Sequence, residues 1–300
     1  MKNKSEVKIG FIGLGLMGTP MTLRLLDAGF NVHVWNRDSA KLGVVVDAGA
    51  TSENSVKDLT ESSDVVMLCL SDTEAVKQVV FAREGVESAG SADKILIDFS
   101  SIDPVETRNF SVRLKEACGM RWIDAPVSGG VAGAASGELI IMAGGDAADI
   151  EGLAAVFWAL SSRITHMGAV GSGQMTKLCN QMIVGCNALI ISEVVALARR
   201  AGVDVDKIPG ALAGGFADSK PFQILAPQMG AHDFSLKWRV KTMLKDLDGA
   251  RKMARQVVSA TPMLELGARI MRNHGDGGHM DGDISTLILA YEPEKPDESS

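Results

Sequence analysis

Short apolar runs recur along the first half of the chain, and segments with helical spacing separate them. The runs cover residues 8–12, 32–35, 65–70 and 95–98, with later ones at 121–124 and 139–143. Each is too short to span a membrane and too continuously apolar for a sheet with one face in water. The pattern therefore predicts an α/β fold with a mostly parallel, doubly wound sheet and helices on both of its faces.

The pattern changes after residue 170. From Gln174 to Ala201 there is no proline, and apolar residues cover most of the helix circumference. A helix that is apolar on nearly all sides is buried, either in a core or against a partner subunit. Gly202 then predicts its end. Four later segments also have helical spacing, at residues 205–215, 221–230, 236–257 and 262–273. We expect an all-α C-terminal domain that begins with a long interdomain helix.

The length of 300 residues exceeds what one hydrophobic core usually supports, which favours two domains. We place the first at residues 1–170 and the second at 171–291. The last stretch, residues 292–300, is charged and contains proline, so we expect a disordered tail.

Composition narrows the choice of partners. The net charge is −7 and no block of lysine and arginine occurs, so neither a nucleic acid nor an anionic membrane is expected as a partner. No run approaches the roughly 18 apolar residues that cross a bilayer. The polar start shows no cleavable signal. None of the four cysteines forms a C-x-x-C pair, which favours reduced, buried thiols in a cytoplasmic protein.

A glycine-rich loop follows the first predicted strand and opens a helix from Thr19 to Ala28. A lone G-x-G-x-x-G is weak evidence, but its place between strand and helix makes it specific for a dinucleotide. In such a loop the first glycine permits the tight turn, the second admits the pyrophosphate and the third lets helix and strand pack. The helix N-terminus then offers N–H groups to the phosphates. The predicted cofactor-binding loop consists of Gly13, Leu14, Gly15, Leu16, Met17 and Gly18.

The residues after the second predicted strand bear on cofactor choice. An NAD site normally carries an acidic residue there for the ribose 2′-hydroxyl, whereas this chain has Asn36-Arg37-Asp38. Neutral Asn36 removes repulsion toward a 2′-phosphate, and Arg37 can pair with that phosphate. Asp38 complicates the choice, because it could reach the ribose or neutralise Arg37. We expect NADP, with NAD as the alternative.

A second glycine-rich stretch covers residues 124–137 and follows another predicted strand. It should lie at the carboxyl edge of the sheet, where open α/β folds bind ligands. Ser128, Gly129 and Gly130 can present a hydroxyl and successive N–H groups to an anion. We expect this loop to bind a substrate carboxylate, and the alternative is a flexible surface loop.

Lys177 lies one turn into the long predicted helix, amid apolar residues. Desolvation would lower its pKa, so that it could give a proton to a developing alkoxide or take one from an alcohol. Asn180 and Gln181 share its face of the helix and could hold a substrate hydroxyl or carboxylate. The alternative is a lysine that extends along the helix surface into water.

One more charged pair, Lys245-Asp246, falls on a predicted helix. From the residues alone, an intrahelical surface pair is as good an interpretation as a site. No metal site is expected.

Together these stretches resemble the β-hydroxyacid dehydrogenase family, which includes 3-hydroxyisobutyrate dehydrogenases, tartronate semialdehyde reductases and glyoxylate/succinic semialdehyde reductases. The resemblance covers residues 7 to about 290 and rests on four motifs in order. They are G-F-I-G-L-G-L-M-G at residues 10–18, D-A-P-V-S-G-G at 124–130, G-S-G-Q-M-T-K-L-C-N-Q at 171–181 and K-D-L at 245–247.

The resemblance implies a Rossmann domain, a helical domain that packs in a homodimer or homotetramer, and a role for each motif. The lysine matching Lys177 is the general acid/base, and the loop matching residues 128–130 binds the substrate carboxylate. Cofactor contacts are implied for Leu70, Ser71, Ser101, Lys245 and Asp246. Gln181 resembles the tartronate semialdehyde reductase subgroup, since the family often has Asn there and Gln is longer by one methylene; the resemblance implies substrate contacts for Asn180 and Gln181.

The expected activity is hydride transfer between NADP(H) or NAD(H) and a short β-hydroxy acid or its semialdehyde. Tartronate semialdehyde, succinic semialdehyde, glyoxylate, 3-hydroxyisobutyrate and 3-hydroxypropionate all remain open as substrates. One alternative is an imine reductase, which usually carries Asp or Tyr where Lys177 stands. Another is a catalytically silent dinucleotide-binding module, which would be expected to lose the lysine or the Ser-Gly-Gly loop.

Overall fold

The computed structural model describes residues 7–292 and divides into two compact units, the first ending at Lys177 and the second beginning at Leu178. The predicted tail falls almost entirely outside the described residues.

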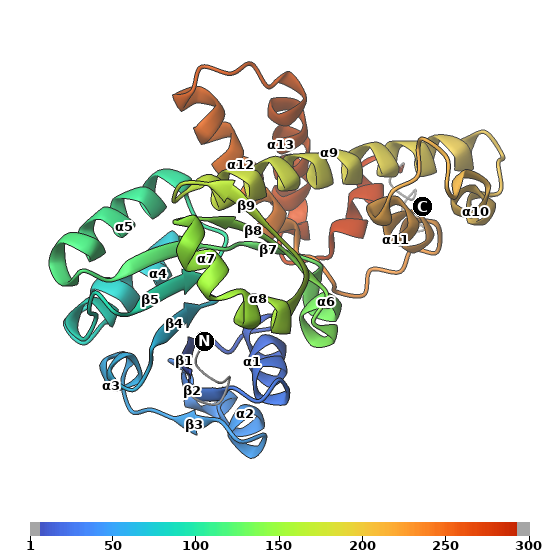
Figure 1. The fold of residues 1–300 in the computed structure, drawn as a ribbon. Coiled ribbons are helices and arrows are strands. Elements are labelled where there is room, and N and C mark those ends of the chain that lie inside the picture. Colours follow the sequence, from blue (N-terminus) through green and yellow to red (C-terminus); the bar gives the residue numbers. More distant parts are fainter. Residues whose placement is uncertain (1–6, 293–300) are drawn as a thin grey trace. The chain divides into compact units, whose positions relative to one another are not determined.

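The first unit is built on one sheet (Figure 1). Its strands are β1 (Lys8–Ile12), β2 (Asn31–Trp35), β3 (Thr51–Ser52), β4 (Val65–Leu68), β5 (Ile95–Asp98), β6 (Arg121–Asp124), β7 (Val127–Ser128), β8 (Leu139–Gly144) and β9 (Ser161–Gly168). The strand order is β3-β2-β1-β4-β5-β6-β8-β7, with β9 paired to β8. All neighbours run parallel except for β8, which is antiparallel to β6 and β7. This confirms the predicted mostly parallel sheet.

Helices complete the unit. They are α1 (Gly18–Asp27), α2 (Gly43–Asp47), α3 (Val56–Glu61), α4 (Thr73–Phe81), α5 (Pro104–Cys118), α6 (Gly130–Ser136), α7 (Ala147–Gly152) and α8 (Ala154–Leu160), with 3-10 turns η2 (Ser39–Lys41) and η3 (Val86–Ser88).

Two cores, one on each face of the sheet, explain the continuous apolar runs. Alternate residues of a strand point to opposite faces. In β4, Val65 and Met67 join the core that also includes residues of α1 and α8, whereas Val66 and Leu68 join the core formed with α3, α4 and α5. Because both faces are buried, no strand in the middle of the sheet can alternate between polar and apolar residues.

The second unit is helical throughout. Its elements are the remainder of α9 (Ser172–Arg200), then η4 (Val205–Lys207), α10 (Ile208–Leu212), α11 (Lys220–Gly230), α12 (Val240–Gln256), α13 (Pro262–His274), the π turn η5 (Gly275–His279) and η6 (Ile284–Ala290). Small residues let the helices approach: a Cβ on Gly185 of α9 would lie 3.0 Å from Leu247 of α12, and one on Gly267 of α13 would lie 3.0 Å from Leu189 of α9.

Two helix predictions need correction. The segment at 205–215 is a 3-10 turn followed by the short α10, and ends at Leu212. The helix predicted from residue 236 begins at Val240, because Asp283 accepts the backbone N–H groups of Lys237 and Trp238 at 2.6 and 2.7 Å and holds this segment extended.

The long helix α9 was expected to be buried in a core or against a partner subunit, and within the described chain it is buried only in part. Apolar side chains on one side are exposed, among them Ile183, Ile190 and Leu197. Of residues 7–292, α9 is also the one helix long and apolar enough to cross a bilayer by length and composition, a test that the core helix of a soluble protein also passes. The expectation that no segment approaches this limit was wrong, and the absence of a membrane partner stays a prediction. Cys179, on the same helix, is exposed rather than buried.

Candidate functional site

The loop at residues 13–18 joins β1 to α1, and its three glycines meet different surroundings. A Cβ on Gly13, whose φ is +102°, would lie 2.4 Å from the Cys69 carbonyl oxygen, and one on Gly18 would lie 1.9 Å from the Gly13 carbonyl oxygen. A Cβ on Gly15 would meet nothing within 4 Å. Close packing therefore requires the first and third glycines, while the middle one faces open space, as a bound pyrophosphate requires.

The other residues of this loop are positioned through the backbone. The Leu14 N–H donates to Asn36 Oδ1 at 2.9 Å, and the Leu14 side chain is buried. The Leu16 side chain is 78% exposed, and Met17 lies just before the first residue of α1. Contact of these three residues with a cofactor stays a prediction.

At the end of β2, Asn36 and Asp38 both have structural partners. Asn36 accepts the Leu14 N–H and donates its amide to the Asp38 carbonyl oxygen at 2.8 Å, which ties the glycine loop to the turn after β2. Asp38 Oδ1 accepts the Ala40 N–H at 3.2 Å and so caps η2. The Asp38 carboxylate thus has a role in this turn that the sequence analysis did not assign to it.

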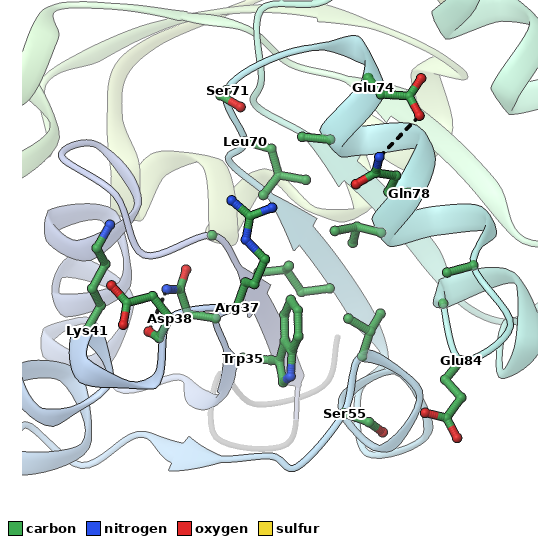
Figure 2. Close-up of a pocket in the computed structure, with 18 of the residues that line it drawn as sticks. Trp35, Arg37, Asp38, Lys41, Ser55, Leu70, Ser71, Glu74, Gln78 and Glu84 are labelled. Carbon is green, nitrogen blue, oxygen red and sulfur yellow. Dashed lines mark hydrogen bonds between the residues drawn. The ribbon is translucent and has the colours of Figure 1, made fainter.

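A pocket of about 1040 Å³ lies beside this turn, and its lining includes Gly13, Arg37, Lys41, Leu70 and Ser71. Figure 2 shows the side chains of Arg37 and Lys41 extending on either side of Asp38. Sequence analysis missed Lys41. The signal in the sequence was a second cation four residues after Arg37. In the structure the short turn η2 places Lys41 at the same pocket as Arg37.

The loops that follow β4 and β5 are joined to each other and to the start of α9. The Leu70 N–H donates to Ser100 Oγ at 2.9 Å. Gln174 donates from Nε2 to the Ser100 carbonyl oxygen at 2.7 Å and accepts the Ile102 N–H at 3.1 Å. Ser101 lies between these two anchored residues, so its backbone is fixed at the carboxyl edge of the sheet.

The predicted carboxylate loop leaves room for a ligand. Ser128 is the last residue of β7, and Gly129 and Gly130 follow with φ of +132° and +62°. A Cβ on Gly130 would meet nothing within 4 Å, and all three residues are at least partly exposed. Two successive positive φ values turn the chain sharply into α6, a conformation that side chains other than glycine rarely adopt.

Lys177 lies next to this loop. Its Nζ donates to the Val127 carbonyl oxygen at 2.9 Å, one residue before Ser128. Both residues belong to the first compact unit. The ammonium group and the Ser-Gly-Gly loop, which are about 50 residues apart in the sequence, are therefore neighbours.

Two buried carboxyl groups lie at the ends of adjacent strands, Asp98 of β5 opposite Asp124 of β6. Desolvation raises the pKa of Asp98 to about 7, against hydrogen bonds from Ser100 that lower it. Desolvation also raises the pKa of Asp124 to about 6, opposed by N–H groups of Gly171 and Gln174. Burial, with a smaller effect of the Asp98 charge, raises the pKa of the Cys69 thiol to about 12, so this thiol is un-ionised at neutral pH.

The site candidates of the second unit contact one another. Asn180 Nδ2 donates to Gln181 Oε1 at 2.9 Å, and Gln181 Nε2 donates to Asp246 Oδ2 at 2.7 Å. Lys245 Nζ lies 3.4 Å from Asp246 Oδ1. Asp246 is 4% exposed, whereas the Lys245 side chain is 38% exposed, so one partner of the pair is buried and the other lies at the surface.

Comparison with known proteins agrees with the geometry. The family model for the NAD-binding domain of 6-phosphogluconate dehydrogenase matches residues 8–168, and that for the NAD-binding domain of NADP-dependent 3-hydroxyisobutyrate dehydrogenase matches residues 171–291. The 2-hydroxy-3-oxopropionate reductase of Escherichia coli K12 is 36% identical over 290 residues, which cover 95% of this chain and 97% of that protein. The chain belongs to the β-hydroxyacid dehydrogenase family.

Two further relatives show the breadth of this family. The NAD-dependent L-serine dehydrogenase of Pseudomonas aeruginosa is 30% identical, with 95% of this chain and 98% of that protein covered. The structure of Mycobacterium tuberculosis 3-hydroxyisobutyrate dehydrogenase with L-serine is similar with a TM-score of 0.86 at 27% identity, covering 96% and 99% of the two chains. A family of NAD(P)-binding dehydrogenases and reductases is thereby established for this chain.

Imine reductases share the fold only. The enzyme from a Pseudomonas species superimposes with a TM-score of 0.65 at 19% identity, covering 97% of this chain and all of that one. The imine reductase alternative therefore has no support beyond the common architecture.

Proposed function

We propose that the chain is an NADPH-dependent reductase of short semialdehyde acids, reversible as a β-hydroxyacid dehydrogenase, with Lys177 as general acid/base. The hydrogen bond from Lys177 Nζ to the Val127 carbonyl oxygen carries the proposal, because it holds a proton donor beside the loop expected to bind a carboxylate.

In this proposal the loop at residues 128–130 binds the substrate and Lys177 transfers the proton. A bound reduced nicotinamide supplies the hydride. Ser128 Oγ and the N–H groups of Gly129 and Gly130 hold the substrate carboxylate, since a turn of successive N–H groups forms an anion-binding concavity. Lys177 gives a proton from Nζ to the carbonyl oxygen as negative charge develops there, and takes it back when the alcohol is oxidised.

The relatives support a carboxylate with an oxygen function on the β carbon as the substrate class. The compounds named for these relatives are 2-hydroxy-3-oxopropionate (tartronate semialdehyde), 3-hydroxyisobutyrate and L-serine, all of which fit this description. Gly129 and Gly130 add no side chain to the loop, so the part of the site next to the carboxylate suits a compact substrate. We place tartronate semialdehyde first.

The preference for NADPH rests on two cations at the pocket. Arg37 and Lys41 line it together, and neutral Asn36 is engaged with Leu14 and Asp38. A 2′-phosphate carries close to two negative charges and would pair with the guanidinium by charged hydrogen bonds. The capping role of Asp38 supports this preference, because its carboxylate is directed to the Ala40 N–H.

We also propose self-association through α9. Ile183, Ile190, Val194 and Leu197 are exposed at spacings of seven, four and three residues, which places them along one side of the helix. Such a stripe is typical of a surface that a second copy covers. Sedimentation velocity should show a dimer or tetramer, and Leu197→Lys should shift it toward the monomer.

Replacing Lys177 tests the catalytic proposal. Lys177→Ala should lower kcat for tartronate semialdehyde by about 10² to 10⁴-fold, the usual contribution of a positioned acid or base. The Kd of NADPH, from its fluorescence, should stay within twofold, since only proton transfer is lost. The assay is loss of reduced-nicotinamide absorbance over a panel with succinic semialdehyde and glyoxylate. Near-wild-type turnover in the variant would refute the assignment.

Replacing Arg37 tests cofactor choice. Arg37→Ser should weaken NADPH binding by roughly 1.5–3 kcal/mol, the cost of a charged hydrogen bond, and leave NADH binding nearly unchanged. Lys41→Ala should change binding in the same direction by less, because an ammonium pairs with phosphate at a single point. An unchanged ratio of NADPH to NADH affinity in both variants would show that neither cation reads the 2′-phosphate.

A further inference from the structure

The first turn of α9 is held against the sheet by a buried carboxylate. Asp124, the last residue of β6, accepts the Gly171 N–H at 2.7 Å on Oδ1 and the Gln174 N–H at 2.8 Å on Oδ2. The first N–H groups of a helix have no partner within the helix. Asp124 is fully buried and reaches them from the sheet rather than from the preceding turn.

This approach is unusually close and depends on two glycines. A Cβ on Gly173 would lie 2.3 Å from the Met142 carbonyl oxygen and 2.9 Å from Asp124 Oδ2. A Cβ on Gly144 would lie 2.5 Å from Asp124 Oδ1. With either side chain present, the turn would have to move away from the end of β6.

Gln174 fixes the same turn from a second direction. Its side chain bonds to the Ser100 carbonyl oxygen and the Ile102 N–H of the loop after β5, and it is 1% exposed. The turn is thus joined to two adjacent strands. Lys177 follows Gln174 by three residues, just under one turn of helix, so its Cα is placed by the same contacts.

We propose that Asp124 is a positioning residue for the reaction: through the Gly171 and Gln174 N–H groups it sets where the Lys177 ammonium lies relative to the Ser128 loop. The inference rests on the proposed function, because it takes Lys177 as the acid/base. Asp124 itself touches no reacting atom. It acts by fixing the helix that carries the lysine, and an error of about 1 Å at such a group can cost 10²-fold in rate.

The test is a double-mutant cycle of Asp124→Asn and Lys177→Ala. Asn keeps the size of the side chain but replaces one acceptor oxygen with an NH₂ donor, which then opposes an N–H of the turn. We expect kcat to fall at least 30-fold in Asp124→Asn, with NADPH affinity within twofold. In the Lys177→Ala background the same change should alter the residual rate by less than twofold, since there is no amine left to position.

Asp98→Asn is the matched control. Asp98 is equally buried and lies opposite Asp124 in the register, but its hydrogen-bond partner in the structure is Ser100 rather than α9. Its kcat should stay within threefold of the wild type. If Asp124→Asn fails to fold, Gln174→Ala takes its place in the cycle, because it removes the second anchor of the turn and leaves Asp124 intact.

The outcomes separate the two proposals. Full activity in Lys177→Ala would overturn the proposed function. An inactive Lys177→Ala combined with a kcat within threefold of wild type in Asp124→Asn would overturn this inference alone. A loss in Asp124→Asn that is equally large in the Lys177→Ala background, or equally large in Asp98→Asn, would also overturn it, because the role would then be general stability.

Discussion

Each compact unit holds a buried carboxylate near its site candidates, and the two are anchored differently. Asp124 in the first unit accepts backbone N–H groups of Gly171 and Gln174. Asp246 in the second pairs with the side chains of Gln181 and Lys245. Backbone anchors fix where a chain segment runs, whereas side-chain anchors fix only the ends of side chains that can rotate away. We therefore expect changes at Asp124 to shift the geometry of a whole loop, and changes at Asp246 to have local effects.

The largest expected effect comes from the glycine loop of the first unit. Gly18→Ala places a Cβ 1.9 Å from the Gly13 carbonyl oxygen, so loop and helix must separate. Overpacking of this kind costs about 1–3 kcal/mol or more in stability. NADPH affinity should fall more than about 100-fold, because the N–H groups that face the phosphates move with the loop.

Gly15→Ala is the matched control for that change. Its Cβ meets nothing within 4 Å, so the melting temperature should stay close to that of the wild type. Cofactor affinity should nevertheless fall, because the methyl group occupies the space of the pyrophosphate. Equal loss of melting temperature in both variants would contradict the division of roles between these glycines.

A smaller effect is expected from the carboxyl group of Asp98. Burial raises its pKa from 3.8 to about 7 in the fold, so the folded state binds the proton more tightly than the unfolded chain does. The contribution of this group to stability therefore falls as pH rises from about 4 through 7, and its full cost applies above pH 7. Asp98→Asn should remove that cost and stabilise the protein by about 1–3 kcal/mol at pH 8.

Urea unfolding at pH 5 and pH 8 measures this prediction. The gain should be largest at pH 8 and should shrink at pH 5, where the wild-type carboxyl group is already protonated in the fold. At each pH, the unfolding free energy of the wild type is subtracted from that of Asp98→Asn. If this difference were smaller at pH 8 than at pH 5, the buried carboxylate would have a partner that compensates its charge.

In the second unit, Gln181→Ala should have a local effect. It removes one partner of the buried Asp246 and should cost about 1–2 kcal/mol in unfolding free energy. Asn180→Ala is its control, because it removes the donor to Gln181 Oε1 and leaves the bond to Asp246 in place. Both variants should bind NADPH as the wild type does if the effect stays local, and fluorescence titration checks this.

The burial of each strand explains how much of the sheet the sequence could predict. The bounds of β1, β5 and β6 match the apolar runs residue for residue, since a strand buried on both faces leaves a clear signal. The sequence did not predict β9, which pairs with β8 outside the main strand order and is mostly exposed. It also missed β3 and β7, which have two residues each.

Some residues of the candidate site could also be predicted from the sequence, and others could not. The glycine loops and Lys177 could be found because their chemistry depends on residue type and on position after a strand. The anchors Asp124 and Gln174 stood inside quoted motifs, but their partners are about 50 and 74 residues away, and such pairings depend on strand order. The ion pair of Lys245 and Asp246 could be predicted from the sequence, but the burial of Asp246 depends on packing that periodicity does not reveal.

The smallest expected effect concerns the end of the described chain. Glu292 pairs with Arg199 and, at 3.0 Å, with His232, and its side chain is 20% exposed. Such partly exposed pairs contribute about 0–1 kcal/mol, and salt screens them. Glu292→Gln should therefore lower the unfolding free energy by less than about 1 kcal/mol in low salt and by nearly nothing in 0.5 M salt. Asp204→Asn, which breaks the exposed pair with Lys207, serves as the control and should be silent in both conditions. A loss at Glu292 that persists in high salt would mean that this side-chain anchor holds the chain as firmly as the backbone anchors at Asp124 do.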